Sequence, residues 1–118
     1  MKVAIVGSRQ FDDYEIFKLL INQMKKKIKI DMIISGGAIG VDNMAYKYAI
    51  ENGITFVCHP PKLEDSYPRK FFHCNLRIVE QSEAVIALPK GKSTRTRHSI
   101  SLAKRLKKDL YIFEMKQS

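Results

Sequence analysis

Five short apolar runs alternate with helix-forming stretches along the 118-residue chain. The runs are KVAIVG, MIIS, ITFVC, AVIAL and LYIFEM, at residues 2–7, 32–35, 54–58, 84–88 and 110–115. Short runs rich in β-branched residues are typical of strands that are buried on both faces of a sheet. Because strands separated by helices pair in parallel through right-handed crossovers, the alternation predicts a doubly wound α/β fold, with helices on both faces of one parallel sheet. We expect the strand order 3-2-1-4-5.

Apolar residues recur at three- and four-residue spacing in the four intervening stretches, which predicts a helix in each. Asp12 and Asp13 offer an N-cap to the first helix, and Asn52-Gly53 is typical of the end of the second. Three prolines in residues 59–70 favour a loop there. The apolar stripes are Ile16, Leu19, Leu20 and Met24; Val41, Met44, Ala45, Tyr48 and Ala49; Phe72, Leu76 and Val79; and Ser99, Leu102, Ala103 and Leu106. No linker interrupts the pattern, so we expect a single domain over residues 1–118.

The composition excludes several classes of protein. No run approaches the ~20 apolar residues of a membrane span, and residues 1–10 have no cleavable-signal pattern, so we expect a cytoplasmic protein of a bacterium or an infected host cell. Cys58 and Cys74 are too few for a disulfide framework and predict free, buried thiols. No His or Cys lies at zinc-finger spacing, so the sequence predicts neither a metal site nor a cofactor.

The net charge of +9 indicates an anionic partner. Residues 1–59 carry eight Lys and Arg against six Asp and Glu, whereas residues 60–118 carry thirteen against six. The basic runs at 25–29 and 104–109 fall where helices should end, and cations suit the helix dipole there. Residues 90–98, KGKSTRTRH, hold four cations that no helix end explains, and we expect this segment to be a loop.

Glycines and polar residues follow the first four strands. Ligands of doubly wound sheets bind outside the carboxyl ends of the strands, here near the switch point between strands 1 and 4. Gly36 and Gly37 leave backbone N–H groups unshielded, and a helix that begins near Gly40 points its positive end at the same place, which suits a phosphate or carboxylate. Residues 93–96 precede the last helix and repeat this arrangement. The candidate ligand-binding residues are Gly7, Ser8, Arg9, Ser35, Gly36, Gly37, Ala38, Gly40, Asp42, His59, Asn75, Lys92, Ser93, Thr94, Arg95 and Thr96.

Several of these residues also have a purely structural interpretation. A glycine pair between a strand and a helix often serves the geometry of the turn alone. Asp42 near a helix start is favoured by the dipole, although it can also reach a sugar hydroxyl. His59, before two prolines, fits a rim residue or a packed ring better than a general base. Asn75 inside a helix is unfavourable unless its amide has a partner, which favours a role for it.

The strand-end segments match a known pattern. The segments are GSRQFDD, IISGGAIGVDNMAYKYAIENG, NLRIVEQSEAVIAL and GKSTRTRHSIS, and they cover nearly the whole chain. Together they resemble the superfamily that joins DNA-processing protein A, the Lonely Guy phosphoribohydrolases and the SLOG nucleotide-sensor domains. The most specific part is Gly-Ser-Arg at residues 7–9 combined with Ser-Gly-Gly-Ala-x-Gly-x-Asp at residues 35–42. The resemblance implies a Rossmann-like fold that binds a nucleotide or nucleotide-derived ligand, with phosphate near the glycines and ribose near Asp42.

Three positions depart from the pattern of the Lonely Guy enzymes, and two of them are those of expected catalytic residues. Those enzymes carry Pro-Gly-Gly-x-Gly-Thr-x-x-Glu after the fourth strand, whereas this chain has Arg95 where a glycine is expected and Ser99 in place of the glutamate. The arginine of their preceding helix corresponds to Cys74, and Asn75 beside it matches an Arg-Asn pair of the DNA-processing relatives. With both catalytic residues replaced, the sequence predicts no catalytic residue and favours a protein that is not an enzyme.

Three functions fit these observations. The first is a stand-alone binder of a nucleotide signal of the ADP-ribose or cyclic-nucleotide type, which senses or sequesters it, with Lys92, Arg95 and Arg97 compensating the phosphates. The second is a phosphoribohydrolase of nucleoside monophosphates. The third is single-stranded DNA binding, which the cations favour although aromatic residues do not interleave with the basic run. The relatives imply a homo-oligomer, and the small size suits a phage or small bacterial protein.

Overall fold

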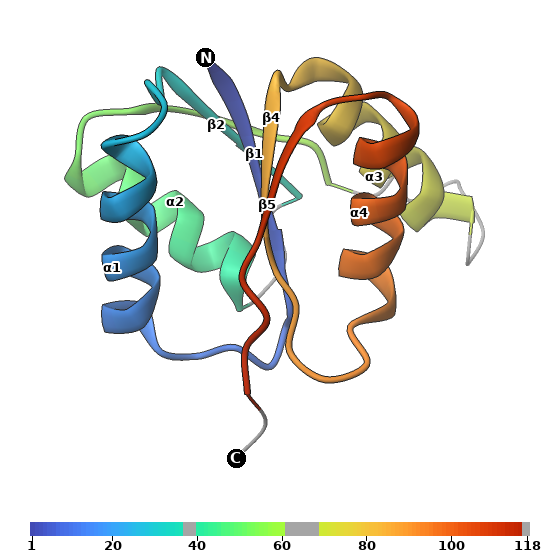
Figure 1. Cartoon of the computed structure of the whole chain (residues 1–118), viewed down its shortest axis with the longest axis horizontal. Coiled ribbons are helices and arrows are strands. Elements are labelled where there is room, and N and C mark those ends of the chain that lie inside the picture. The colour runs from blue at the N-terminus through green and yellow to red at the C-terminus, as the bar shows by residue number, and fades with distance from the viewer. Residues whose placement is uncertain (37–39, 61–68, 117–118) are drawn as a thin grey trace.

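In the computed structural model, the five predicted strands form one parallel sheet in the order β3-β2-β1-β4-β5 (Figure 1). The structure describes residues 1–36, 40–60 and 69–116. The strands are β1 (Lys2–Gly7), β2 (Met32–Ser35), β3 (Thr55–Cys58), β4 (Ala84–Leu88) and β5 (Asp109–Ile112). The helices are α1 (Tyr14–Lys25), α2 (Val41–Glu51), α3 (Arg69–Gln81) and α4 (Thr94–Arg105). The predicted fold class and strand order are confirmed, and the fold is Rossmann-like.

The middle strand, β1, pairs in parallel with β2 on one side and with β4 on the other. From β1 the chain first winds outward through β2 and β3, and it then crosses back to form β4 and β5 on the other side of β1. The connections therefore diverge between β1 and β4. In a doubly wound sheet, this point leaves room for a ligand at the carboxyl ends of the strands.

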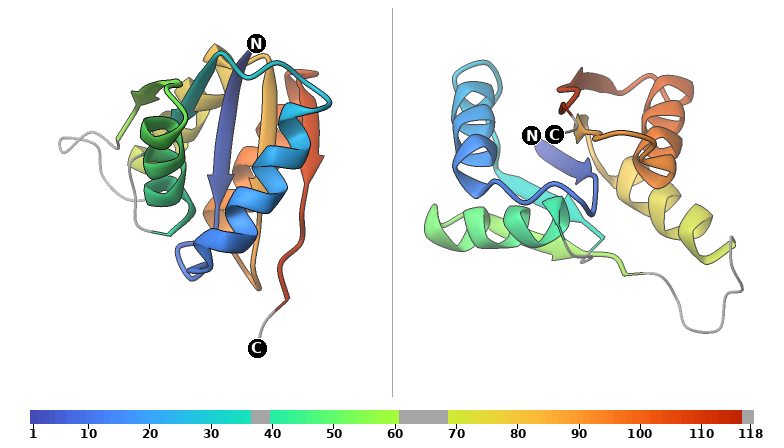
Figure 2. Two further views of the ribbon diagram at one scale, coloured as in Figure 1. Left: turned by 90° about the vertical axis from the view of Figure 1, so that its left-hand side faces the viewer. Right: turned by 90° about the horizontal axis from the view of Figure 1, so that it is seen from below.

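Helices cover both faces of the sheet. Helices α1 and α2 lie on one face, and α3 and α4 lie on the other, as the end-on view shows (Figure 2). The side chains of β1 point alternately to the two faces of the sheet. Val3 and Ile5 pack in the core under α1 and α2. Ala4 and Val6 pack in the core under α3 and α4. The apolar runs do not alternate with polar residues because both faces are buried.

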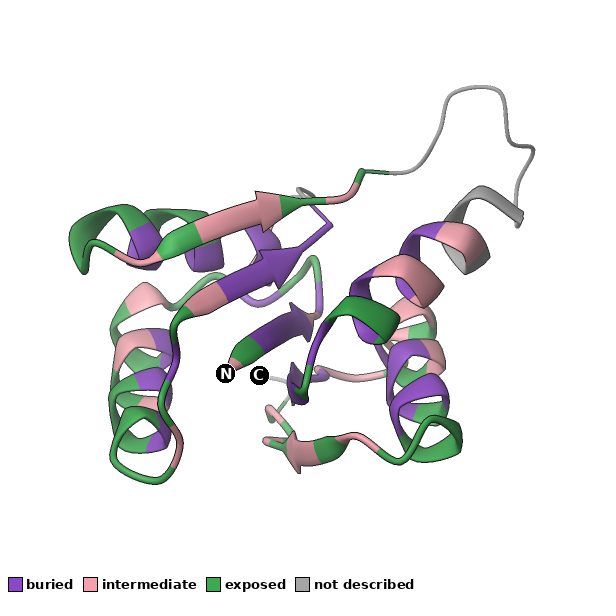
Figure 3. Ribbon diagram, turned by 90° about the horizontal axis from the view of Figure 1, so that it is seen from above, coloured by how far each residue is buried: buried purple, intermediate pink, exposed green. Residues whose placement is uncertain are grey.

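Burial decreases from the centre of the sheet to its edges (Figure 3). All five residues of β4 are buried, whereas the edge strands β3 and β5 each begin and end on an exposed residue. Cys58, at the exposed end of β3, is one of these. The prediction of two buried thiols is therefore correct for Cys74 and wrong for Cys58, because an edge strand has a neighbour on one side only.

The bounds of the last helix and of the last strand differ most from those that the sequence predicted. Asp13 caps α1, with its carboxylate accepting from the Ile16 N–H at 3.2 Å. The last helix begins at Thr94, so residues 94–98 are helical and not the loop that the sequence predicted. The last strand begins at Asp109 and ends at Ile112, although Phe113 and Met115 still donate to the carbonyls of Ala87 and Pro89. The predicted proline-rich loop falls largely outside the described residues.

Within residues 1–36, 40–60 and 69–116, no helix combines the length and apolar character needed to cross a membrane.

Candidate functional site

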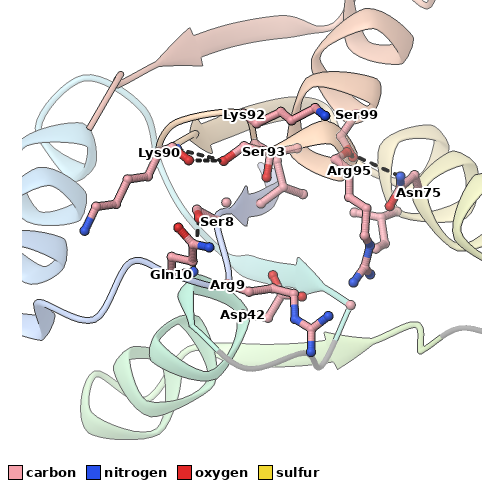
Figure 4. Close-up of a pocket in the computed structure, with 15 residues that line it drawn as sticks. Ser8, Arg9, Gln10, Asp42, Asn75, Lys90, Lys92, Ser93, Arg95 and Ser99 are labelled. Atoms are coloured by element: carbon pink, nitrogen blue, oxygen red, sulfur yellow. Dashed lines mark hydrogen bonds between the residues drawn. The ribbon is translucent and has the colours of Figure 1, made fainter. Parts of the chain in front are cut away.

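A pocket of about 290 Å³ lies at the carboxyl ends of β1 and β4, where α2 and α4 begin (Figure 4). It occupies the switch point at which the sequence predicted a ligand site. Its described lining residues come from β1, the loops after β1 and β4, the end of β2, and α2, α3 and α4. They are Val6, Gly7, Ser8, Arg9, Gln10, Gly36, Asp42, Asn75, Ile78, Lys90, Lys92, Ser93, Arg95, Thr96 and Ser99.

Two glycines let the loop after β1 meet the start of α2 at this pocket. A Cβ at Gly7 would lie 2.5 Å from Val41 Cγ2, and a Cβ at Gly40 would lie 2.6 Å from Ser8 O. Gly40 also has a φ of +80°, which L side chains rarely adopt. The Val41 N–H donates to Ser8 O at 3.4 Å and joins the two segments. The glycines therefore bring the Gly-Ser-Arg segment against the first turn of α2.

Asp42 lies in the first turn of α2 and is 9% exposed. A Cβ at Gly36 would lie 3.1 Å from Asp42 Oδ2, so the glycine that follows β2 leaves room for this carboxylate. Asp42 is the one carboxylate among the described residues that line the pocket. A carboxylate at this place accepts hydrogen bonds from hydroxyl groups and repels anions.

The pocket is bordered by cations. Among its described lining residues, Arg9, Lys90, Lys92 and Arg95 carry positive charge. Figure 4 shows the Arg95 side chain reaching toward Arg9 and Asp42, whereas the Lys90 side chain leads away from both arginines. Burial lowers the pKa of Arg95, the Asp42 charge acts in the opposite direction, and the Arg9 charge adds to the lowering. An arginine stays protonated at neutral pH, so the pocket holds a partly buried cation that faces a second one.

The loop between β4 and α4 forms one wall. Ser93 adopts the left-handed conformation, with a φ of 41°, and its hydroxyl accepts from the Lys90 N–H at 2.9 Å and donates to Lys90 O at 2.6 Å. Because that hydroxyl is used inside the loop, it does not cap α4, and within the described residues α4 has no side-chain cap and no acidic residue in its first turn. The positive end of α4 therefore borders the pocket.

Asn75 has the partner that its place in a helix requires. It is 5% exposed, and its Nδ2 lies 3.0 Å from His98 Nδ1 and donates to Arg95 O at 3.4 Å. Burial lowers the pKa of His98, and the Arg105 charge acts in the same direction, so the ring is neutral at pH 7 and its Nδ1 can accept. These contacts join α3 to the first turns of α4 beside the pocket.

Ten of the predicted site residues line the pocket: Gly7, Ser8, Arg9, Gly36, Asp42, Asn75, Lys92, Ser93, Arg95 and Thr96. Gly40, Ser35 and Thr94 are not among the described lining residues. Gly40 is the N-cap of α2, Ser35 is buried in the sheet, and Thr94 is exposed on α4. The His59 ring lies 2.6 Å from Gln81 Oε1 and is not part of the lining. Gly37 and Ala38 fall outside the described residues.

Sequence reasoning missed five lining residues: Val6, Gln10, Ile78, Lys90 and Ser99. Helical spacing contained a signal for two of them, because Ile78 follows Asn75 by three residues and Ser99 follows Thr96 by three. Gln10 directly follows the Gly-Ser-Arg segment, and Lys90 belongs to the basic segment that the charge pattern had already identified. We expected Ser99 in the apolar stripe of the last helix, and it is 1% exposed.

The two residues at the expected catalytic positions of the phosphoribohydrolases, Ser99 and Cys74, have structural partners. The Ser99 hydroxyl donates to Arg95 O at 3.3 Å. Burial raises the pKa of the Cys74 thiol to about 11, and its Sγ donates to His59 O at 2.7 Å, so Cys74 is a neutral hydrogen-bond donor. Neither side chain supplies the charge of the residue it replaces. Within the described residues, no group of three His, Cys, Asp or Glu side chains is placed to hold a metal ion.

The chain is similar in structure to DNA processing protein A from Helicobacter pylori, with a TM-score of 0.72 and 22% sequence identity over 95% of this chain. It spans 64% of that protein, which is less than two thirds. That structure is described as showing a unique single-stranded DNA binding mode. At this identity, the similarity shows that the two proteins share a fold.

A weaker similarity links the chain to the C-terminal domain of a hydrogenase from Pyrococcus furiosus. The TM-score is 0.44 and the identity 10%, over 94% of this chain and 89% of that one. A search of curated proteins by sequence found no match. The model of the DNA recombination-mediator protein A family matches residues 1–110, which is nearly the whole chain. The chain therefore belongs to the DNA recombination-mediator protein A family.

Proposed function

We propose that the chain binds single-stranded DNA, and that its pocket takes one phosphate of the strand together with the attached nucleotide. The observation that carries this proposal is the convergence of Arg9, Lys92 and Arg95 on a pocket beside the N-terminus of α4. Arginine donates to phosphate oxygens in a fixed fork, and a lysine adds a mobile point charge. Membership of the family supports the choice of DNA, since the structural neighbour from Helicobacter pylori is named for that ligand.

The size of the pocket limits its occupant. Its volume of about 290 Å³ is near the lower end of the roughly 300–1,000 Å³ that pockets for small ligands span. One nucleotide is therefore the largest unit we expect in it, and the rest of a strand lies on the rim. The described lining residues are polar, charged or aliphatic, so we expect them to contact the phosphate backbone of the strand.

The test is a titration of the protein into a fluorescently labelled oligothymidylate of about 16 nucleotides, followed by anisotropy at several salt concentrations. We expect Arg9, Lys92 and Arg95 to neutralise three phosphates of the strand, one in the pocket and its neighbours on the rim. The logarithm of the binding constant should then fall with the logarithm of salt concentration at a slope of about −2, since each neutralised phosphate of a single strand contributes about −0.7. Absence of binding at low salt, near 50 mM, would contradict the proposal.

A free nucleotide is the second candidate, and Asp42 favours it. A buried carboxylate at the pocket accepts hydrogen bonds from the vicinal hydroxyls of a ribose, which DNA lacks. Competition against the labelled strand with adenosine monophosphate, ADP-ribose and a cyclic dinucleotide ranks the two candidates. A competitor that also raises the melting temperature of the protein identifies a nucleotide ligand.

The order of these candidates differs from the one that the sequence suggested, in which single-stranded DNA came third. Single-stranded DNA is now placed first because the chain matches the model of the DNA recombination-mediator protein A family. The phosphoribohydrolase is not proposed, since Ser99 and Cys74 occupy its two diagnostic positions. The single domain, the homo-oligomer and the cytoplasmic location stay predictions.

A further inference from the structure

The Arg97 guanidinium joins the loop that precedes its own helix to the segment that follows β5. Its Nε donates to Lys92 O at 3.0 Å, and its Nη2 donates to Gly91 O at 2.6 Å. Its Nη1 and Nη2 also donate to the two carboxylate oxygens of Glu114, at 2.9 and 3.1 Å. Arg97 lies in α4, Gly91 and Lys92 lie in the preceding loop, and Glu114 follows β5. We call this set of contacts the Arg97–Glu114 clamp.

The loop held by the clamp has a backbone that needs support. Gly91 has a φ of 67° and Ser93 a φ of 41°, so two of its residues are left-handed. A serine pays a steric cost in that conformation and adopts it when surrounding contacts enforce it. On the inner side, the Ser93 hydroxyl bonds to both backbone groups of Lys90. On the outer side, Arg97 binds the carbonyls of Gly91 and Lys92.

The chain after β5 is fixed to the same loop. The Met115 N–H donates to Pro89 O at 2.8 Å, and Lys90 and Met115 form an isolated parallel bridge. Glu114 is thereby held beside the loop while its carboxylate receives Arg97. Figure 1 shows this last segment running past the loop at the carboxyl end of the sheet. Residues more than twenty positions away in the sequence thus hold the loop that forms one wall of the pocket.

We propose that Arg97 and Glu114 are positioning residues for the phosphate pocket, and that they act by holding the backbone that carries Lys92 and Ser93. This inference rests on the proposed function. Arg97 does not line the pocket. The carbonyl oxygens of Gly91 and Lys92, which accept from Arg97, therefore face away from the pocket and do not repel a phosphate there. The clamp therefore favours the anion through orientation as well as through the placement of Lys92.

The clamp and the overall charge predict opposite changes in DNA affinity when Glu114 is neutralised. Replacing Glu114 by glutamine raises the net charge of the protein, and if charge alone mattered, the variant would bind a polyanion more tightly. The clamp predicts weaker binding, because a neutral amide holds Arg97 less well and the loop loses its outer support. Both side chains are substantially exposed, at 44% for Arg97 and 58% for Glu114, so their ion pair contributes little to global stability.

The test compares Glu114→Gln with Glu80→Gln, which makes the same charge change on an exposed residue near the end of α3, away from the pocket. We expect Glu114→Gln to bind the labelled oligothymidylate up to about fivefold more weakly than the wild type, which is the upper limit for the loss of one exposed ion pair. Glu80→Gln should bind as well as the wild type or slightly better. Equal or tighter binding by Glu114→Gln, with the wild type binding normally, overturns the clamp and leaves the proposed function standing.

A double-mutant cycle separates positioning from a general loss of structure. In a Lys92→Ala background, Glu114→Gln should lose most of its effect, because the lysine that the clamp positions is absent. Additive effects of the two substitutions would contradict positioning.

Hydrogen exchange tests the clamp without a ligand. The amides of Lys90 and Met115 should exchange faster in Glu114→Gln than in the wild type, whereas the amides that pair β1 with β4 should be unchanged. Unchanged exchange at Lys90 and Met115 overturns the inference even if the wild type does not bind DNA.

Discussion

Gly40 and Arg9 approach so closely that a Cβ on Gly40 would lie 2.7 Å from Arg9 Cα. The Gly-Ser-Arg segment after β1 and the first turn of α2 can pack together only because Gly40 has no side chain. Its φ of +80° adds a second reason for glycine, since an L residue is strained in this conformation. The contact places Ser8, Arg9 and Asp42 around one pocket.

Gly40→Ala should destabilise the protein and distort the pocket. We expect the free energy of unfolding in urea to fall by about 2–4 kcal/mol, the sum of backbone strain at this positive φ and overpacking. Gly53→Ala is the matched control, because Gly53 has a φ of +64° and a Cβ there would meet nothing within 4 Å. It should cost about 1 kcal/mol, from strain alone. Equal costs for the two variants would show that the contact with Arg9 is unimportant.

Lys92→Ala should weaken DNA binding and reduce its salt dependence. Loss of one phosphate contact predicts a salt slope that is less steep by about 0.7. Lys104→Ala removes the same charge from an exposed position in the last turn of α4, far along the helix from the pocket. It should leave the slope near that of the wild type. If both variants change the slope equally, binding depends on net charge and not on the pocket.

Asp42→Asn should separate the two candidate ligands. Removing a like charge near a bound phosphate should strengthen oligothymidylate binding at least about fivefold, because charges about 4 Å apart repel by ~1 kcal/mol in bulk water and a buried carboxylate is screened less. A free ribonucleotide that uses Asp42 as a hydroxyl acceptor should instead bind more weakly. Anisotropy with the labelled strand and calorimetry with adenosine monophosphate give the two affinities. Unchanged or stronger binding of adenosine monophosphate would contradict the assignment of Asp42 to a ribose.

His98 should make stability depend on pH. Its pKa is lowered from 6.5 in the folded protein, first by burial and then by Arg105, so the unfolded chain takes up a proton at a higher pH than the folded chain does. The free energy of unfolding should therefore fall as pH decreases through about 6.5, and this decrease should stop below the folded pKa. Urea unfolding between about pH 5 and 8 measures the slope. The slope near pH 6 should be smaller in His98→Gln, and an unchanged slope would exclude His98 as its source.

The boundaries of β1, β2 and β4 could be predicted because buried strands leave uninterrupted apolar runs. The beginning of α2 was equally clear, since Gly40 and Asp42 are typical of a helix start. The beginning of α4 was not. Residues 94–98 are Thr, Arg, Thr, Arg and His, which form no apolar stripe, and their helix is stabilised by contacts with α3. Thr96 is buried there, and the Asn75 amide reaches Arg95 O and His98.

The sequence by itself determined the order of the strands and helices along the chain and the edge of the sheet at which the pocket lies, because periodicity and glycine placement act over a few residues. Only the tertiary structure decided which side chains share the pocket wall. The contacts between Asn75 and His98 and between Arg97 and Glu114 join residues 23 and 17 positions apart. Such pairs leave no local pattern, because their partners become neighbours only after the sheet has brought α3, α4 and the segment after β5 together.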